Sequence, residues 1–486
     1  MTHILDIIKN SAKKFPNKTA IIFENKKLTY LELYDEIINF SNSLRCVPKG
    51  SVISMYFQNS IDFVITYFGI LNSSCIAHIV PYSISEQNFI NQINSSNPYL
   101  ILTSKNNFDY LSQFKINKNI EIFNEIKEIS TSDLTNQNYF DDFAYLIYTS
   151  GTTSMPKGVG ITHSNVLFTT KNIVNILKYS PSDIDILPLP LYHSFGLGCM
   201  HTSFFVGSTL ILHQNASNLE ELFVSINKHK ATTLSSVPST LTKILEYFSN
   251  EEIEKKMENL RLIITNSTSI SENTVKRYEQ ILKNGNLATY YGLTEASRST
   301  FMIFDKQNKE KSVGIPAPHV NIKLINEKGC EDKIGTIWIN GPNVIKKYWN
   351  DSSDGKNIVN DWLNTGDIGS LDSDGYLYIN GRLDDMINVS GEKVFPEEIE
   401  TVVLQIKGIK EAAAVGMDHK IFGQVVKLFV NKVEDSHITK SEIMSYCIRN
   451  LERYKVPLKI EFVESLPRTD YGKIQRSKLR SEKFGF

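Results

Sequence analysis

The sequence predicts an α/β protein with a large N-terminal domain and a smaller C-terminal domain. Short apolar runs alternate with longer amphipathic segments, as strands and helices do in an α/β fold. A chain of 486 residues is long enough for more than one domain. A turn and a glycine-containing connector precede a charge-rich C-terminal region. Together these observations place a domain boundary at Asp384, so that residues 1–383 form the first domain and 384–486 the second.

The expected elements follow this alternation in chain order. Four apolar runs predict strands, at 100–102, 145–148, 209–212 and 260–265. Three longer amphipathic segments predict helices, at 164–177, 219–229 and 271–282. The sequence Asp372-Ser373-Asp374-Gly375 is typical of a turn, after which we expect a short strand over 376–380 and a connector over 381–385.

Composition narrows the class of protein. The chain is 41% apolar and 22% charged with a net charge of -1, which is ordinary for a globular protein and does not suggest a nucleic-acid binder. The N-terminus lacks the basic start and apolar core of a secretory signal, and no apolar run is long enough for a membrane span, so we expect a cytoplasmic protein. The 5 cysteines lack C-x-x-C spacing, so neither a disulfide framework nor a zinc site is indicated.

The most informative stretch follows the apolar run 143–148. Small hydroxyl and glycine residues gather there ahead of a lysine: Thr149, Ser150, Gly151, Thr152, Thr153, Ser154 and Lys157. Glycine lets backbone amides approach an anion, hydroxyls donate further hydrogen bonds, and lysine adds positive charge, so the stretch predicts a polyphosphate site. A Walker A loop needs Gly-Lys-Ser/Thr, whereas Pro156 precedes this lysine and Gly158 follows it. A polar surface loop is the other interpretation.

Further motifs lie at wide spacing along the chain. They are Leu28-Thr29-Tyr30-x-Glu32-Leu33, Tyr291-Gly292-Leu293-Thr294-Glu295, Thr365-Gly366-Asp367, Gly381-Arg382-Leu383-Asp384-Asp385 and Arg468-Thr469-Asp470-Tyr471-Gly472-Lys473. With the loop at 149–158, their order and content resemble the adenylate-forming superfamily of acyl-CoA synthetases, adenylation domains and beetle luciferases. The resemblance implies a large domain of several α/β subdomains, followed by a small mobile α+β domain.

The resemblance also implies how the chain handles ATP and Mg²⁺. Glu295 would bind Mg²⁺, Thr294 would hydrogen-bond a phosphate, and Tyr291, after which Gly292 follows, would stack on adenine. Asp367 would accept the ribose hydroxyls and Arg382 would contact the ribose. Taken alone, Asp367 fits a turn-capping aspartate equally well.

The two half-reactions of the family require different groups at the reacting carbon. Lys473 matches the lysine of the small domain that bridges the carboxylate and the α-phosphate during adenylation. Rotation about Asp384, at the matching hinge position, would then replace this lysine with a thiol. Gly391 and Lys393 lie in the segment that resembles the wall of the pantetheine tunnel.

Three places in the sequence supply candidates for the acid pocket. His193 stands where amino-acid-activating domains carry an aspartate, which argues against an α-amino acid, although a histidine satisfied by core neighbours is the alternative. The stretch Asn266-Ser267-Thr268-Ser269 stands where the family usually has a Gly-Gly-Ala-Pro-like stretch, and Tyr290 stands where a glycine often precedes the Tyr-Gly-x-Thr-Glu motif. Added bulk and polarity favour a short, polar or aromatic acid over a long-chain fatty acid, unless these side chains satisfy one another.

Four functional interpretations follow. The first is an AMP-forming ligase that joins a carboxylic acid to CoA, with ATP and Mg²⁺. The second is a stand-alone adenylating enzyme that loads the phosphopantetheine of a separate carrier protein. A luciferase is disfavoured because fold alone does not license oxygen chemistry. A non-catalytic nucleotide-binding regulator is disfavoured because Lys473, Glu295 and Asp367 are all present.

Overall fold

The computed structural model describes the chain except for Lys115, Ser269 and the ranges 127–141, 150–156, 306–307, 350–356, 420–421, 470–472 and 482–486. The chain packs as two compact units. The first unit comprises Met1–Asn321 with Ile339–Leu363, and the second comprises Ile322–Trp338 with Asn364–Phe486. Asp384 lies within the second unit, and its role as a domain boundary remains a prediction.

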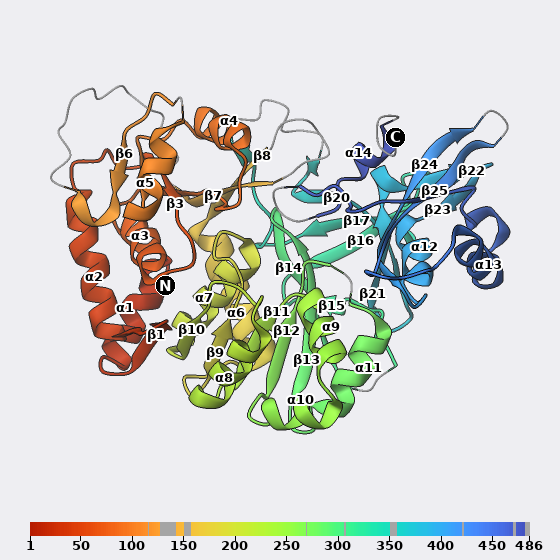
Figure 1. Cartoon of the computed structure of the whole chain (residues 1–486). Helices are drawn as coiled ribbons and strands as arrows, with labels where there is room; N and C mark the ends of the chain where they lie inside the picture. The colour runs from red at the N-terminus through yellow and green to blue at the C-terminus, as the bar shows by residue number, and fades with distance from the viewer. Residues whose placement is uncertain are drawn as a thin grey trace. The chain divides into compact units, whose positions relative to one another are not determined.

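A nine-stranded sheet forms much of the first unit (Figure 1). Its order is β15 (Ile315–Pro316), β14 (Ala296–Phe304), β13 (Asn286–Leu293), β12 (Leu262–Thr265), β11 (Thr233–Ser236), β9 (Ile184–Leu187), β10 (Thr209–Leu212), β1 (Thr19–Phe23), β2 (Lys26–Thr29). The strands from β13 through β1 pair in parallel, and β2, β14 and β15 add antiparallel edges. The carboxyl ends of the parallel strands therefore meet at one edge of the sheet, where α/β proteins bind their ligands.

A seven-stranded sheet completes the first unit. Its order is β18 (Tyr348–Trp349), β8 (Lys157–Thr162), β7 (Phe143–Thr149), β4 (Ile76–Ile79), β3 (Val52–Tyr56), β5 (Leu100–Thr103), β6 (Ile120–Ile122). Most of its pairs are parallel, but β7, β8 and β18 pair antiparallel. This antiparallel edge carries both ends of the predicted phosphate loop.

Helices separate the strands, as the alternation predicted. They are α1 (Leu5–Lys14), α2 (Tyr30–Ser43), α3 (Ile61–Asn72), α4 (Glu86–Ser96), α5 (Lys105–Ser112), η1 (Phe123–Glu125), α6 (His163–Leu177), α7 (Ser194–Val206), α8 (Leu219–His229), α9 (Pro238–Tyr247), α10 (Asn250–Lys256), α11 (Glu272–Ile281). Hydroxyl N-caps start several of them; Thr29 and Thr162, for example, each form a capping box. Figure 1 shows α8 to α11 gathered beside the strands β9 to β13.

The remaining two sheets have five strands each. One has the order β16 (Asn321–Ile325), β17 (Ile334–Asn340), β20 (Trp362–Leu371), β19 (Ile358–Val359), with β21 (Leu377–Arg382) also paired to β20. The other has the order β23 (Glu392–Val394), β22 (Ile387–Val389), β25 (Gly423–Lys432), β24 (Ile409–His419), with β26 (Lys459–Phe462) paired to β25. The accompanying helices are η2 (Leu383–Asp385), α12 (Pro396–Val403), α13 (Lys440–Asn450), η3 (Arg453–Lys455), α14 (Arg476–Arg480). Apolar residues of this second sheet and of α12 and α13 form one core, so the second unit has the α+β composition expected.

The predicted elements are confirmed, with corrections at their ends. The strand predicted over 260–265 begins at Leu262, because the backbone amide of Leu260 donates to the backbone oxygen of Met257 in a turn. The strand predicted over 376–380 occupies Leu377–Arg382, so Gly381 and Arg382 belong to it and not to a connector. The pairing of Asp367 with Arg382 across β20 and β21 extends the ladder to that point.

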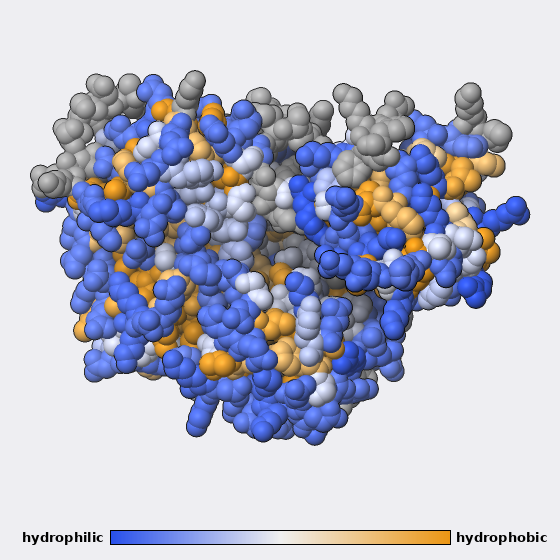
Figure 2. All heavy atoms as spheres, in the orientation of Figure 1, coloured by the Kyte–Doolittle hydropathy of each residue, from blue (hydrophilic) through white to orange (hydrophobic). Residues whose placement is uncertain are grey.

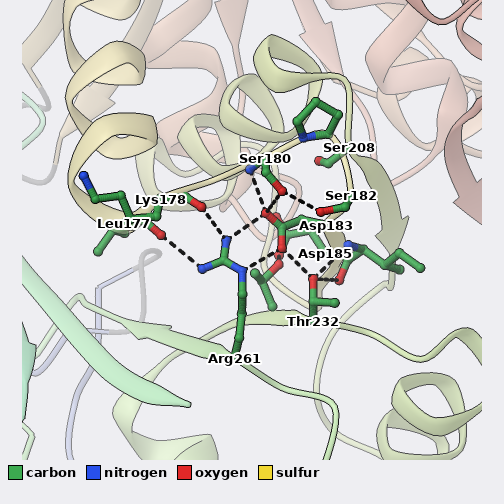
Figure 3. Close-up of polar contacts among 12 residues, drawn as sticks. Leu177, Lys178, Ser180, Ser182, Asp183, Asp185, Ser208, Thr232 and Arg261 are labelled. Carbon is green, nitrogen blue, oxygen red and sulfur yellow. Dashed lines mark hydrogen bonds and ion pairs between the residues drawn. The ribbon is translucent and has the colours of Figure 1, made fainter. Parts of the chain in front are cut away.

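A buried polar network ties together the amino ends of three neighbouring parallel strands (Figure 3). Asp183, Thr232 and Arg261 immediately precede β9, β11 and β12. Arg261 donates from Nε and Nη2 to the two carboxylate oxygens of Asp183, at 2.8 and 2.7 Å. Thr232 Oγ1 and the backbone amide of Ser180 also donate to this carboxylate, at 2.8 and 2.7 Å. The network lies at the sheet edge opposite the carboxyl ends, so it stabilises the fold away from a ligand site.

Three sequence-based exclusions can be compared with the structure. All five cysteines are free thiols. Among the described residues, no helix combines the length and apolarity needed to cross a membrane. The same part of the chain holds no group of three or more His, Cys, Asp or Glu side chains arranged for a metal. Figure 2 shows a face that is mostly hydrophilic, with hydrophobic patches between the polar side chains.

Candidate active site

Strands β7 and β8 hold the two ends of the predicted phosphate loop. Thr149 ends β7, Lys157 begins β8, and the two are register partners. The intervening candidates Ser150, Gly151, Thr152 and Thr153 lie outside the described residues. The ammonium of Lys157 lies 5.4 Å from the ring centroid of Tyr348, a residue of the neighbouring strand β18. A cation over an aromatic face is held by electrostatic attraction, so Tyr348 helps to fix this lysine.

The motif Tyr-Gly-x-Thr-Glu forms a tight hairpin. Leu293 pairs with Ala296, so Thr294 and Glu295 make up the two-residue turn between β13 and β14. A β-carbon at Gly292 would lie 2.4 Å from the backbone nitrogen of Arg298, which explains why the motif needs glycine there. Tyr291, which precedes it, is half-buried and donates its backbone amide to Thr300 Oγ1 at 3.3 Å.

Tyr348 connects the phosphate loop to this hairpin. Its hydroxyl donates to Glu295 Oε1 at 3.4 Å, while its ring faces Lys157. A cation and a carboxylate that lie far apart in the sequence therefore contact one side chain. Tyr348 could not be predicted from the sequence, because it lies outside every motif and only its aromatic character distinguishes it.

Glu295 fits the metal proposed for it. Mg²⁺ is usually held by one or two protein carboxylates together with substrate phosphates, and it does not need a cage of protein ligands. Glu295 is a single half-buried carboxylate that contacts Tyr348, as Lys157 does, and it meets that requirement. The lack of a three-ligand group among the described residues is consistent with such a site.

The candidate acid-pocket residues surround the start of α7 and the end of β13. His193 is the N-cap residue of α7, and its half-buried ring lies 4.7 Å from that of Tyr192. The Asn266 amide donates to the backbone oxygen of Tyr290 at 3.1 Å. Ser267 is exposed and has φ of 92°, a conformation that favours the glycine it replaces. The structure thus brings Asn266 and Tyr290 together, and part of the added polarity is satisfied within the protein.

Arg298 is a further residue of this region that belongs to no sequence motif. It follows Glu295 by three positions, and only 4% of its surface is exposed. Its guanidinium lies 4.8 Å from the ring centroid of Tyr290 and reaches the first turn of α7. The sequence gives little sign of this placement, since an arginine in a hairpin is most often exposed.

In the second unit, the predicted ribose ligands form an ion pair. Arg382 Nη1 donates to Asp367 Oδ1 at 2.8 Å and to the backbone oxygen of Thr365 at 3.0 Å. Asp367 is almost fully buried, and Arg382 is about one-third exposed. The interaction orients the carboxylate, while its contact with ribose remains a prediction.

Gly391 and Lys393 belong to the hairpin formed by β22 and β23. Ser390 and Gly391, with φ of 55° and 95°, form its two-residue turn, a geometry that favours glycine. Lys393 forms an ion pair with Glu327. An open depression beside this turn is lined by Asn388, Ser390, Gly391, Phe422, Gly423 and Gln424.

Lys473 lies in a turn stabilised by the backbone. Its carbonyl accepts from the amide of Thr469 at 2.8 Å, and its side chain is exposed. None of the described carboxylates forms an ion pair with its ammonium. The preceding motif residues Asp470, Tyr471 and Gly472 lie outside the described part of the chain.

Comparison with known proteins places this geometry in a family. The profile of the family described as "AMP-binding enzyme" matches residues 8–349, and that of the "AMP-binding enzyme C-terminal domain" matches 398–473. The chain therefore belongs to the AMP-binding enzyme family, as the motifs predicted.

Individual relatives specify the class within the family. An oxalate–CoA ligase of Arabidopsis thaliana is 30% identical, over 97% of this chain and 96% of the relative. A long-chain-fatty-acid–CoA ligase of Haemophilus influenzae is 28% identical, over 99% of this chain and 94% of the relative. The chain thus groups with enzymes that join a carboxylic acid to CoA.

Solved structures of one further protein share the fold throughout. The o-succinylbenzoate CoA synthetase of Bacillus subtilis, in complex with the acyl-adenylate intermediate, has a TM-score of 0.88 at 27% identity, with 99% of both chains covered. The same synthetase with ATP and a magnesium ion has a TM-score of 0.86 at 26% identity, covering 98% of this chain and 99% of the other.

Proposed function

We propose that the protein is an AMP-forming ligase that activates a short, polar or aromatic carboxylic acid with ATP and transfers the acyl group to CoA. In the first half-reaction, a carboxylate oxygen attacks the α-phosphorus of ATP and pyrophosphate leaves. In the second, the thiol sulfur attacks the acyl carbon and AMP leaves. The contact of both Lys157 and Glu295 with Tyr348 carries the proposal, because it joins a phosphate-directed cation to a metal-directed carboxylate.

The side chains have separable tasks in the first half-reaction. Both reactants are anions, so positive charge must offset their repulsion. Lys157 and the loop before it bind the phosphates, Thr294 donates to a phosphate oxygen, and Tyr291 stacks on adenine. Glu295 would hold Mg²⁺, which supplies further neutralisation of the phosphates. Asp367, oriented by Arg382, accepts the ribose hydroxyls, and Lys473 bridges the carboxylate and the α-phosphate.

A separate carrier protein is the alternative acceptor of the acyl group. Its phosphopantetheine presents the same thiol as CoA, and the turn at Gly391 with Lys393 is suited to either. The CoA-ligase relatives favour CoA as the acceptor. We propose that the reaction takes place in the cytoplasm.

The test is the release of AMP and pyrophosphate with ATP, Mg²⁺ and a panel of acids, with and without CoA, followed by mass spectrometry. We expect acid-dependent turnover that requires CoA and yields an acyl-CoA, with short or aromatic acids preferred. Pyrophosphate release that stalls in the presence of CoA would identify a carrier protein as acceptor. A preference for palmitate would refute the proposed acid class.

A further inference from the structure

Arg298 is a buried cation without an anionic partner. Its relative exposure is 4%, and its guanidinium forms no ion pair with any carboxylate of the described residues. Its partners are neutral: Nη2 donates to the backbone oxygens of Phe195 and Ser194 at 3.2 and 3.4 Å, and Nη1 donates to Ser297 Oγ at 2.7 Å. Its Nε is buried without a hydrogen-bond partner. A buried charge is costly unless it is paired, so this guanidinium is incompletely compensated in the protein alone.

The surroundings of Arg298 suit a small polar ligand. The hydroxyl of Tyr290, whose ring faces the guanidinium, is also buried without a hydrogen-bond partner. Burial lowers the pKa of the nearby His201 to about 3, with Arg298 acting in the same direction, so this histidine is neutral and adds no charge. Two buried polar groups without a hydrogen-bond partner, Arg298 Nε and the Tyr290 hydroxyl, therefore belong to side chains that contact each other. The ring of Phe195 packs against Tyr290 and makes these surroundings partly apolar.

The Arg298 guanidinium contacts the helix that begins at the candidate acid-pocket residue His193, and it forms no hydrogen bond or ion pair with the described residues predicted to bind the nucleotide. The guanidinium contacts the two residues that follow His193, and it packs against Gly198 of the same helix. A β-carbon at Gly198 would lie 2.2 Å from Nη2, so glycine makes room for this side chain. Lys157, predicted to bind phosphate, and Glu295, predicted to bind Mg²⁺, instead contact Tyr348.

We propose that Arg298 binds a second carboxylate of the acid substrate, so that the substrate class is a short dicarboxylic acid. The inference rests on the proposed function, because it assigns the acid of that same reaction. A carboxylate accepts two parallel hydrogen bonds from a guanidinium, and it would supply the missing anionic partner. The second carboxylate is distinct from the one that attacks ATP, which is handled by Lys473.

The test compares matched acids of equal length on the wild type and Arg298→Gln. The pairs are malonate with propionate and succinate with butyrate, with oxalate and palmitate added, and the readout is kcat/KM for CoA-dependent AMP release. We expect the wild type to prefer the diacid of a pair. The variant should lose on the order of 100-fold in kcat/KM for the diacid, mainly through KM, and change less than about threefold for the monoacid and in the KM for ATP.

Two further variants separate binding from folding. Gly198→Ala displaces the guanidinium without removing its charge, so it should also lower the preference for the diacid. Arg261→Gln changes an arginine of the opposite sheet edge, and it should lower stability without altering the ratio between diacid and monoacid. In thermal-shift measurements without ATP, the diacid should stabilise the wild type and not Arg298→Gln.

The outcomes distinguish this inference from the proposed function. Turnover confined to monoacids or palmitate, or an Arg298→Gln variant that retains the wild-type diacid preference, overturns the role of Arg298 and leaves the ligase function intact. Equal losses for diacid and monoacid would assign Arg298 to the reacting carboxylate and also overturn the inference. Absence of turnover with every acid overturns the proposed function and this inference with it.

Discussion

Two positively charged side chains, Lys473 and Arg298, differ in their exposure to water. Lys473 is exposed and has no ion pair with a described carboxylate, so its charge is solvated and costs little to maintain. Arg298 is buried among neutral groups, so its charge is costly unless a ligand pairs with it. The first arrangement suits a group that acts in only one half-reaction, and the second suits a fixed binding group.

Replacing Lys473 by alanine should separate the half-reactions. A positive charge about 4 Å from an anion is worth roughly 4 kcal/mol gross at an effective dielectric of about 20. Since ~1.4 kcal/mol is a factor of ten, Lys473→Ala should slow adenylate formation by roughly 10²–10³-fold. Thioester formation from a supplied acyl-adenylate should continue at close to the wild-type rate. Lys478→Ala, an exposed lysine of the same segment, serves as the control; equal loss of both half-reactions in Lys473→Ala would disprove the assignment.

At the scale of elements, the two ends of the parallel strands have different roles. The carboxyl ends carry candidate binding residues, and the amino ends carry a stabilising polar network. The carboxyl end of β13 leads into the Tyr-Gly-x-Thr-Glu motif, and Asn266 follows the carboxyl end of β12. The amino ends of β9, β11 and β12 instead meet at the Asp183 network (Figure 3). Burial by itself would raise the pKa of Asp183, but hydrogen bonds from Arg261, Ser180 and Thr232 outweigh it, so this pKa lies below its ordinary value of 3.8.

The stability of the Asp183 network should depend on pH. Because the folded-state pKa of Asp183 is lowered, its stabilisation is present above pH 3.8 and is lost as the pH falls through the folded-state value. Asp183→Asn should lower the free energy of unfolding by about 2 kcal/mol or more at pH 7, since it leaves Arg261 without its anion. Denaturant titrations from pH 7 down to pH 3 should show the difference between wild type and variant narrowing below about pH 4.

Asp185 provides the matched control for that experiment. Burial raises its pKa to about 6, against opposing hydrogen bonds from Thr233 and Ser203. The contribution of Asp185 to the free energy of unfolding is therefore greatest below pH 3.8, and it declines as the pH rises through about 6. The stability of the wild type relative to Asp185→Asn should fall over that range, opposite in direction to the Asp183 series. A constant difference across pH in the Asp183 series would refute the role given to its charge.

At the scale of the whole molecule, the second unit connects the predicted hinge to the segment that follows Lys473. Arg480 donates to the backbone oxygen of Asp384 at 3.1 Å and pairs with Asp385 at 2.7 Å. Arg476 pairs with Asp385 at 3.3 Å and donates to both oxygens of Glu400 at 2.9 Å. These contacts tie η2 to α14, so a change of backbone angles between Arg382 and Asp384 would move both together.

Restricting the backbone at Asp384 should uncouple the half-reactions. Proline fixes φ and removes a backbone donor, so Asp384→Pro should hold the chain in one conformation. We expect one half-reaction to fall by about tenfold or more while the other stays within about threefold, as measured by pyrophosphate exchange and by thioester formation from supplied adenylate. Asp384→Ala controls for loss of the side chain. Unchanged rates for both half-reactions in Asp384→Pro would exclude rotation about this residue.

Much of the fold could be predicted from local patterns. The helix at 219–229 and the strand at 209–212 have the predicted bounds. The buried residues of the helix recur at helical spacing, and the strand is a short apolar run that is buried at every position. The end of β21 was misplaced, because Gly381 is typical of connectors and only its pairing with Ile368 retains it in the sheet. The hairpin at Thr294 and Glu295 could not be placed, since its turn depends on the register of β13 against β14.

The sequence by itself determined the family, the order of the motifs and most of the residues proposed to handle ATP. Those residues act through their chemical type, which a linear motif preserves. Only the tertiary structure showed that Tyr348 contacts both Lys157 and Glu295, and that Arg298 is buried without an anion. Such facts depend on distances between residues far apart in the chain and on which charges are removed from water, and neither is written in the local sequence.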